Sequence, residues 1–218
     1  MAGEPWQISR DMFLEESEVE QLLADVRRRT VEADAGDATP VVDQLIIEIL
    51  VFSGLRPSEF CRLRVQDARL KAAESSLEIT EGAGQHRSVS IPRWLSQAIA
   101  GYLKKIRPLF LDVRNGADSP TSPLILNERG RGYERTSLYR RVTRILTTAG
   151  LGERASVQLL RHTYGYLAYK RSGGNLLFVQ RQLGHAHPMV TAIYAQFEEE
   201  RPTELANQIG TANRPQPS

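Results

Sequence analysis

The sequence predicts a mostly helical protein with a small antiparallel β-sheet, an α+β fold. Two patterns carry this prediction. Apolar residues recur at helical spacing through most of the 218 residues. Between residues 76 and 91, polar and apolar residues instead alternate in two short runs, which is typical of a hairpin. The sequence contains no internal repeat, so we expect one helical domain that carries this sheet.

Several segments have helical periodicity. The predicted helices are a segment from Leu14, residues 41–53, a short segment after Pro57, and residues 93–106, 136–148, 158–172 and 175–182. Ser17 is the expected N-cap of the first helix, and Glu20 completes its capping box. Gly54 suits a left-handed end for the second helix. Pro57 suits the first position of the third helix.

The hairpin is predicted from two alternating runs that cover residues 76–80 and 87–91. The Gly-containing segment 81–85 between them reads as its loop. Pro92 ends the second strand because proline cannot donate to a strand ladder.

Three segments divide the chain. Residues 1–12 are expected to be a loosely ordered lead-in, and residues 13–197 form the domain. Residues 198–218 are expected to form a short C-terminal helix and a tail that ends Pro-Gln-Pro-Ser. The length suffices for one large domain with its own core.

The composition is that of an ordinary soluble protein, with 41% hydrophobic and 25% charged residues. No apolar run approaches the roughly 20 residues of a membrane helix, and the N-terminus lacks a signal-peptide pattern. Cys61 is the one cysteine, which excludes an intramolecular disulfide and a cysteine metal cluster. We therefore expect a cytoplasmic protein without membrane association.

Charge is distributed unevenly along the chain. Residues 1–50 contain 12 acidic and 4 basic residues, a net charge of −8. Residues 101–181 contain 15 basic and 5 acidic residues, a net charge of +10. Such asymmetry indicates a polyanionic partner for the basic part, although a solvated helix surface would give the same count.

Two arginines lie where a guanidinium can serve an anionic ligand. Arg56 is placed on a tight corner between two predicted helices, and its planar donors suit phosphate oxygens. The alternative role is to satisfy carbonyls at a helix end. Arg161 lies among apolar residues of a predicted buried helix, where it must be paired or bind a ligand. Its alternative is a structural ion pair.

A histidine and a tyrosine near the C-terminal end complete the set of candidates. His185 follows Gly184, a residue that permits a helix end. His185 and His187 would suggest a metal site, but no further ligand cluster in the sequence supports one, so we expect no metal and no other cofactor. Tyr194 alone would be an ordinary packing residue.

Four motifs, taken together and in order, resemble the phage integrase family, the tyrosine recombinases. They are Gly-Leu-Arg ending at Arg56, Leu-Arg-His-Thr around Arg161, Leu-Gly-His ending at His185 and Thr-x-x-Tyr ending at Tyr194. The resemblance covers about residues 12–197. It implies the tyrosine recombinase catalytic-domain fold, in which these segments converge on one DNA phosphate.

The resemblance also implies an activity. Arg56, Arg161 and His185 would stabilise the charge of a phosphate under attack, and Tyr194 would form a 3′-phosphotyrosyl bond. The protein would be a site-specific recombinase or integrase that acts on double-stranded DNA without a cofactor. It would self-associate on DNA as a dimer, and as a tetramer at synapsis, with the C-terminal tail docked on a neighbouring subunit. The tail could instead pack on its own domain.

The sequence departs from the family pattern at two proton-handling positions. The family places a Lys in the hairpin as a general acid, whereas Glu81 lies there in this chain, with His86 and Arg87 as candidate substitutes. Gln158 stands where the family often has a His, and it cannot shuttle a proton. These departures leave a second reading open, a catalytically impaired DNA-binding protein with the recombinase fold. A chance match in an unrelated helical protein is a third, disfavoured by the basic segment.

Overall fold

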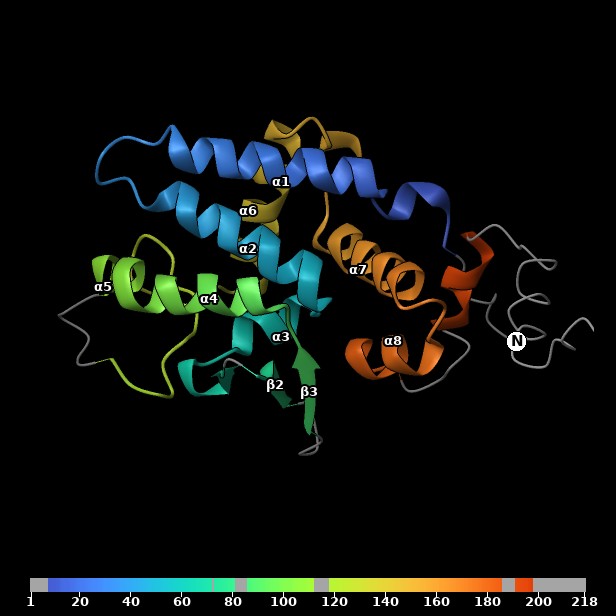
Figure 1. Cartoon of the computed structure of the whole chain (residues 1–218). Coiled ribbons are helices and arrows are strands. Elements are labelled where there is room, and N and C mark those ends of the chain that lie inside the picture. The colour runs from blue at the N-terminus through green and yellow to red at the C-terminus, as the bar shows by residue number, and fades with distance from the viewer. Residues whose placement is uncertain (1–7, 72, 81–85, 112–117, 186–190, 198–218) are drawn as a thin grey trace, which may run out of the picture.

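A computed structural model describes residues 8–71, 73–80, 86–111, 118–185 and 191–197 (Figure 1). The elements within these residues are, in chain order, η1 (Arg10–Met12), α1 (Glu16–Val31), α2 (Thr39–Ser53), α3 (Pro57–Arg62), η2 (Val65–Asp67), β1 (Ala68–Leu70), β2 (Ser75–Thr80), β3 (His86–Ser90), α4 (Arg93–Gly101), the π-helical turn η4 (Tyr102–Ile106), α5 (Arg107–Phe110), α6 (Arg135–Thr148), η6 (Gly152–Arg154), α7 (Val157–Arg171), α8 (Leu176–Leu183) and η7 (Ile193–Phe197). The predicted α+β class is confirmed.

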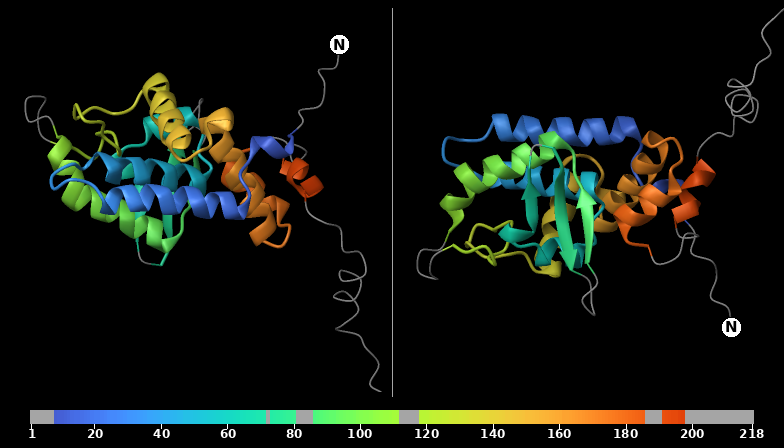
Figure 2. Two further views of the ribbon diagram at one scale, coloured as in Figure 1. Left: turned by 90° about the horizontal axis from the view of Figure 1, so that it is seen from above. Right: turned by 60° about the horizontal axis from the view of Figure 1, so that its bottom comes forward.

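Helix α2 is the centre of the core, and it contacts α1, α4, α6 and α7. Every position from Leu45 to Val51 is buried, which agrees with the apolar run in the sequence. Helix α1 lies along one side of α2 (Figures 1 and 2). Its predicted cap was wrong. Glu15, not Ser17, is the N-cap, and the capping box pairs it with Glu18, because the helix begins at Glu16.

The sheet has three antiparallel strands in the order β1-β2-β3 (Figure 2, right). The predicted hairpin is confirmed, with Ser76 opposite Ser90 and Thr80 opposite His86. Its loop, residues 81–85, lies outside the described residues. Strand β1 escaped prediction because it has three residues and none of them is buried, so no alternating pattern marks it.

The helix predicted over residues 93–106 differs in the structure. Helix α4 ends at Gly101, a π-helical turn follows, and α5 then extends to Phe110. Pro108 has no N–H to donate, which disturbs the regular bonding one turn earlier. The hydroxyl of Tyr102, a buried residue of this turn, accepts a bond from the Leu126 backbone at 2.9 Å. Within the described residues, no helix has both the length and the apolar character needed to cross a membrane.

Helix α7 runs through the interior, and its Leu-Arg-His-Thr motif is buried. All residues from Leu159 to Leu167 are buried, including the charged Arg161. Gly54 ends α2 with φ +61°, and a Cβ there would lie 2.4 Å from Tyr164 and 2.8 Å from Leu183. The end of α2 therefore packs directly on α7 and α8. This close approach brings three sequence motifs together.

Candidate active site

Three guanidinium groups from three elements meet the C-terminal end of α8. Arg87 (β3), Arg161 (α7) and Arg56 (the N-cap of α3) donate to the carbonyl oxygens of Gln182, Leu183 and Gly184 at 3.3, 2.7 and 2.9 Å, respectively. The last carbonyls of a helix have no partner within it and form the negative end of its dipole. The end of α8 therefore gathers three cations in a small volume.

Gly184 makes this gathering sterically feasible. Its φ is +64°, a left-handed conformation that favours glycine. A Cβ at this position would lie 2.9 Å from the guanidinium of Arg87. The residue thus ends α8 and leaves room for the arginine that approaches from the hairpin.

Glu59 supplies the negative charge that balances two of these arginines. Both of its oxygens bind Arg87, at 2.8 and 2.9 Å, and it accepts further bonds from the side chain and backbone N–H of Arg56, at 2.8 and 2.7 Å. Burial alone would raise the pKa of Glu59, but these bonds outweigh it and lower the pKa to about 2. The carboxylate is ionised at neutral pH and orients both guanidiniums.

Arg161 has a different environment. It is 5% exposed and donates to the carbonyl oxygens of Gly54 and Leu183. Among the described residues its hydrogen-bond partners are these carbonyls, and no carboxylate forms a salt bridge with it. Burial and the nearby Arg56 lower the pKa of Arg161 to about 10, so it is still charged at neutral pH. An anionic ligand would offset the electrostatic cost of burying this charge.

His185 follows Gly184, the C-cap of α8, and lies within the field of the arginines. Its Nδ1 is 3.0 Å from the Thr191 hydroxyl. Burial and the charges of Arg161 and Arg56 lower the pKa of His185 to about 4, so the ring is neutral at pH 7. With Nδ1 accepting from Thr191, Nε2 carries the proton and can donate it to a ligand. His187 lies outside the described residues, among which no group of three or more His, Cys, Asp and Glu side chains could hold a metal.

Tyr194 is packed against α7. Its ring covers Gly165, where a Cβ would lie 2.2 Å from Tyr194 Cζ, and it is 1% exposed. Its hydroxyl is 3.3 Å from Nδ1 of His162. Burial raises the pKa of the Tyr194 phenol, and the charge of Arg161 opposes part of that rise. His162 is not among the site residues predicted from the sequence, where packing or a backbone hydrogen bond is its expected role. Its one available signal was a polar side chain inside a buried motif.

The remaining sequence candidates are scattered around this centre. Gln158 is exposed and lines a pocket of about 390 Å³ that His162 also lines. His86 is exposed on β3, with Nδ1 3.2 Å from the Thr80 hydroxyl. Glu81 lies outside the described residues. The structure thus brings Arg56, Arg87, Arg161, His185 and Tyr194 to one region, with Gln158 and His86 at its edges.

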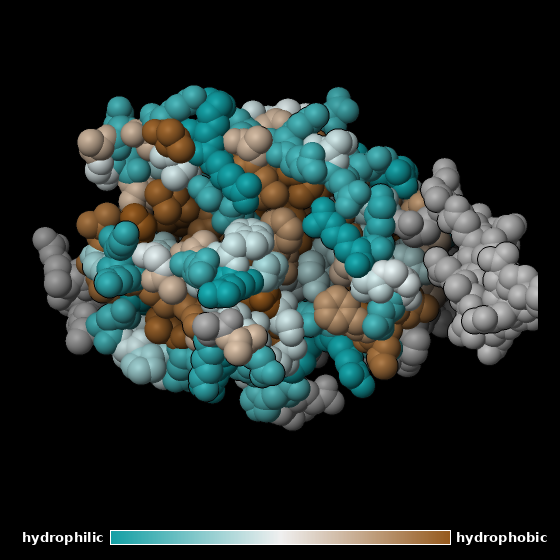
Figure 3. Space-filling model, viewed as in Figure 1, coloured by the Kyte–Doolittle hydropathy of each residue, from teal (hydrophilic) through white to brown (hydrophobic). Residues whose placement is uncertain are grey.

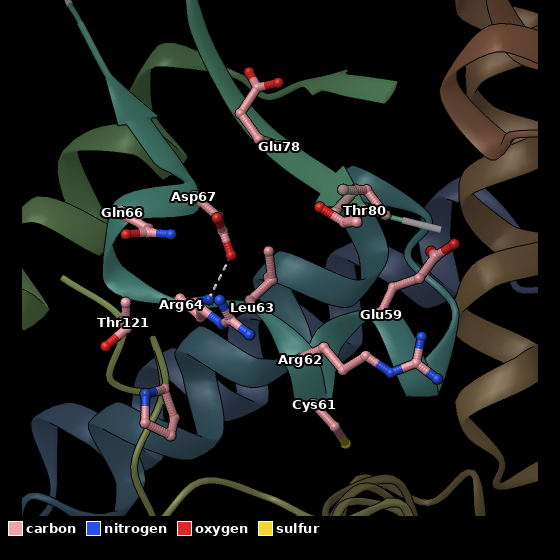
Figure 4. A pocket seen from close by; sticks show the side chains of 12 residues that line it. Glu59, Cys61, Arg62, Leu63, Arg64, Gln66, Asp67, Glu78, Thr80 and Thr121 are labelled. Atoms are coloured by element: carbon pink, nitrogen blue, oxygen red, sulfur yellow. Dashed lines mark hydrogen bonds between the residues drawn. The ribbon is translucent and has the colours of Figure 1, made fainter. Parts of the chain in front are cut away.

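A larger pocket of about 570 Å³ lies on the far side of Glu59 (Figure 4). Glu59 is at one end of it and Gln66 at the other, with Arg62 and Arg64 between them. Its lining mixes both charge signs and includes neither histidine nor tyrosine of the candidate site. This pocket therefore borders the candidate site without being its chemical centre.

Comparisons with known proteins agree with this geometry. The family model described as "Phage integrase family" matches residues 12–201. The chain is 28% identical over 198 residues to the tyrosine recombinase XerH of Helicobacter pylori, covering 90% of this chain and 49% of that protein. It is 30% identical over 174 residues to the tyrosine recombinase XerC of Thermodesulfovibrio yellowstonii, covering 79% and 56%. The chain thus spans about half the length of these relatives.

Solved structures share the fold. The XerH recombinase bound to palindromic difH substrate, a post-cleavage complex, matches with a TM-score of 0.71 and 26% identity, over 89% of this chain and 52% of that one. The XerA recombinase matches with a TM-score of 0.66 over 97% and 67%, at 22% identity. The fold is therefore that of tyrosine recombinase catalytic domains, and the chain belongs to the phage integrase family.

Proposed function

We propose that the chain is the catalytic domain of a site-specific DNA recombinase that cleaves and rejoins DNA through a 3′-phosphotyrosyl bond to Tyr194. The observation that carries this proposal is the convergence of Arg56, Arg161, His185 and Tyr194 from four separate elements around the end of α8. Its relatives are named as tyrosine recombinases, and the matched XerH structures contain DNA substrate.

The chemistry fits these residue types. When Tyr194 Oη attacks phosphorus, the bond to the 5′-oxygen breaks, and negative charge builds on the non-bridging oxygens. Arg56 and Arg161 would exchange their carbonyl partners for these oxygens, and His185 Nε2–H would donate to one of them. Rejoining reverses the step, with a 5′-hydroxyl as nucleophile. Because the phosphotyrosyl bond conserves the energy of the broken bond, the reaction needs no nucleotide cofactor.

Access to Tyr194 must accompany DNA binding. Its side chain is 1% exposed, whereas the side chain of Arg56 is 38% exposed. A phosphate can therefore reach Arg56 first, and attack requires the hydroxyl of Tyr194 to be uncovered. Cleavage would then occur after DNA has bound and the Tyr194 hydroxyl has been uncovered.

The hairpin residues differ in their fitness to replace the usual lysine. Arg87 is bound by both oxygens of Glu59 and is too basic to be an effective acid at neutral pH. His86 is exposed at the start of β3, and an imidazole can both donate and accept a proton. His86 is thus the better candidate to protonate the departing 5′-oxygen.

A second candidate function is DNA binding without cleavage. Two observations favour it: no lysine lies between Lys71 and Lys104, and Gln158 occupies the position where the family often has a histidine. General acid and base catalysis contribute about 10²–10⁴-fold each. Losing both would leave a protein that binds DNA through the same arginines and reacts slowly.

We also propose that the protein self-associates on DNA in the cytoplasm. One structural relative is a lambda integrase dimer bound to its core site. Helix α8 exposes Leu176, Leu177 and Phe178, and Figure 3 shows apolar surface where α8 lies in Figure 1. Such surface is a common feature of protein interfaces. Residues 198–218, the segment expected to be exchanged between subunits, lie outside the described residues.

A covalent-trapping experiment tests the main proposal without knowledge of the target site. The 218-residue chain is incubated with nicked duplexes that carry a randomised core, and adducts that survive denaturation are recovered and sequenced. We expect an adduct that the wild-type chain forms and Tyr194→Phe does not. An adduct that persists in Tyr194→Phe would disprove the role of this tyrosine.

The same experiment separates the two candidate functions. Salt-dependent binding of duplex DNA without any adduct would support the DNA-binding alternative. Adducts that form slowly, and more rapidly with a 5′-bridging phosphorothiolate, whose sulfur leaves without protonation, would locate the defect in the general acid.

A further inference from the structure

His162 and Tyr194 form a hydrogen-bonded pair in the interior. Nδ1 of His162 is 3.3 Å from Tyr194 Oη, and the two residues are 5% and 1% exposed. In a neutral imidazole protonated at Nε2, Nδ1 is an acceptor, so the tyrosine hydroxyl donates to it. This separation is slightly longer than the about 2.6–3.2 Å that general base catalysis uses, and such contacts are commonly long before substrate binds and tighten in the reacting complex.

The position of His162 relative to Gln158 gives this pair its significance. The two residues are four apart on α7, so they lie on one face of the helix, and both line the pocket of about 390 Å³. The amide of Gln158 cannot take a proton at neutral pH. An imidazole that can take one is available one helical turn further along, in contact with the tyrosine.

Building on the proposed function, we propose that His162 is a catalytic residue, the general base that takes the proton of Tyr194 during strand cleavage. In this step the Tyr194 O–H bond breaks and its proton moves to His162 Nδ1. The bond from Oη to phosphorus forms while the bond to the 5′-oxygen breaks, and that oxygen takes a proton from His86, the general acid proposed above. In rejoining, the imidazolium returns its proton to the tyrosine.

The surroundings of His162 set its protonation state. Burial and the adjacent Arg161 lower its pKa to about 4, which keeps the ring neutral and able to accept. Among the described residues, the other charged or titratable groups in this region include His185, Tyr194, and Asp11, Glu153 and Arg154 around the shared pocket. A phosphate held by Arg161 would offset the positive charge beside His162 and increase its basicity when DNA is bound.

The pocket provides a way to test the proposal by chemical rescue. His162→Ala leaves a space of imidazole size at the wall of this pocket, so added imidazole can enter it. At saturating DNA, we expect the single-turnover rate of adduct formation to fall about 100-fold or more in His162→Ala. Added imidazole should raise the rate of His162→Ala at least about tenfold and reach a plateau with imidazole concentration. The less basic 1,2,4-triazole should raise this rate less.

Two further variants control this experiment. Met12→Ala enlarges the same pocket without touching the tyrosine, so its rate should equal that of the wild type and should not respond to imidazole. His162→Asn places an amide near Nδ1 that can accept the hydrogen bond but cannot take the proton. It should fold, bind the selected DNA with unchanged affinity and still cleave slowly, even where His162→Ala fails to fold.

The outcomes separate this proposal from the one on which it rests. If the wild type forms an adduct that Tyr194→Phe lacks, the recombinase function stands. A His162→Asn rate within threefold of the wild type, or a folded His162→Ala that no imidazole restores, would then overturn the general-base role alone. Absence of any adduct from the wild type would overturn both.

Discussion

At the scale of single residues, Glu59 is the group on which the arginine cluster depends. It is 6% exposed as a residue, and it holds Arg56 and Arg87 at once. Guanidiniums packed this closely repel one another, and a buried carboxylate between them offsets that repulsion. Removing it would leave cations near the end of α8 without their shared counter-ion.

This dependence predicts a specific response to pH. The pKa of Glu59 is about 2 in the folded chain and about 4.5 when it is exposed. A lowered folded pKa contributes stability above the unfolded pKa, so roughly 3 kcal/mol present at neutral pH is lost as pH falls from about 5 to 2. Urea unfolding from pH 7 to 2.5 should show this loss in the wild type.

Glu59→Gln is the matched variant for that measurement. It keeps the shape of the side chain but not its charge, so it should lose about 3–5 kcal/mol at neutral pH. Its stability should then depend less on pH below 5. Parallel pH curves for the two proteins would show that other carboxylates cause the acid sensitivity.

At the scale of elements, α7 positions Tyr194 because Gly165 leaves space for the tyrosine ring on the helix surface. Gly165 is a helical residue, and helical glycine is intrinsically unfavourable by about 1 kcal/mol relative to alanine. The ring of Tyr194 occupies the space that a side chain would take. Gly165 thus lowers the helix propensity of α7 but allows the ring of Tyr194 to pack closely on it, one turn after Arg161.

Gly165→Ala should therefore destabilise the protein despite the better propensity of alanine. Its Cβ would lie 2.2 Å from the tyrosine ring, and overpacking of this kind costs about 1–3 kcal/mol. The control is Gly101→Ala in α4, where a Cβ meets no atom within 4 Å and should add up to about 1 kcal/mol. Thermal unfolding compares them. Equal gains in stability in both variants would contradict the close packing of Tyr194 on Gly165.

At the scale of the whole molecule, charge is distributed unevenly between the N-terminal helices and the later helices. The acidic N-terminal segment supplies α1, where Arg28 is paired with Asp25 and Glu32. The basic residues 101–181 contribute α6 and α7, and α7 carries Arg161 into the candidate site. A polyanion should therefore bind on the side of α7 and α8 rather than along α1.

DNA binding should accordingly fall steeply with salt, and the slope should identify the contacts. For each tenfold increase in salt concentration, the base-ten logarithm of the association constant falls by about 0.9 per neutralised phosphate. Arg56→Ala should make that slope shallower by about 0.9, the contribution of one phosphate contact. Arg28→Ala, exposed on α1, should leave it unchanged. Fluorescence anisotropy over a salt series measures both, and an equal change in both variants would argue against a defined DNA face.

Local patterns in the sequence determined much of this protein. Helical periodicity predicted most helices, alternation predicted the β2–β3 hairpin, and the ordered motifs at Arg56, Arg161, His185 and Tyr194 indicated the family. These features are readable because each arises within a few neighbouring residues. Strand β1 and the π-helical turn were missed, since both are short and depend on packing.

Only the tertiary structure decided what these residues contact. Arg56 and Gly184 are 128 positions apart, and Arg161 and Gly54 are 107 apart, yet each pair shares a hydrogen bond. No periodicity encodes such distances, because they result from helices packing on one another. The same packing placed Arg87 on Glu59 and His162 against Tyr194. The sequence thus determined which chemical groups are present, while the folded core decided which of them can act together.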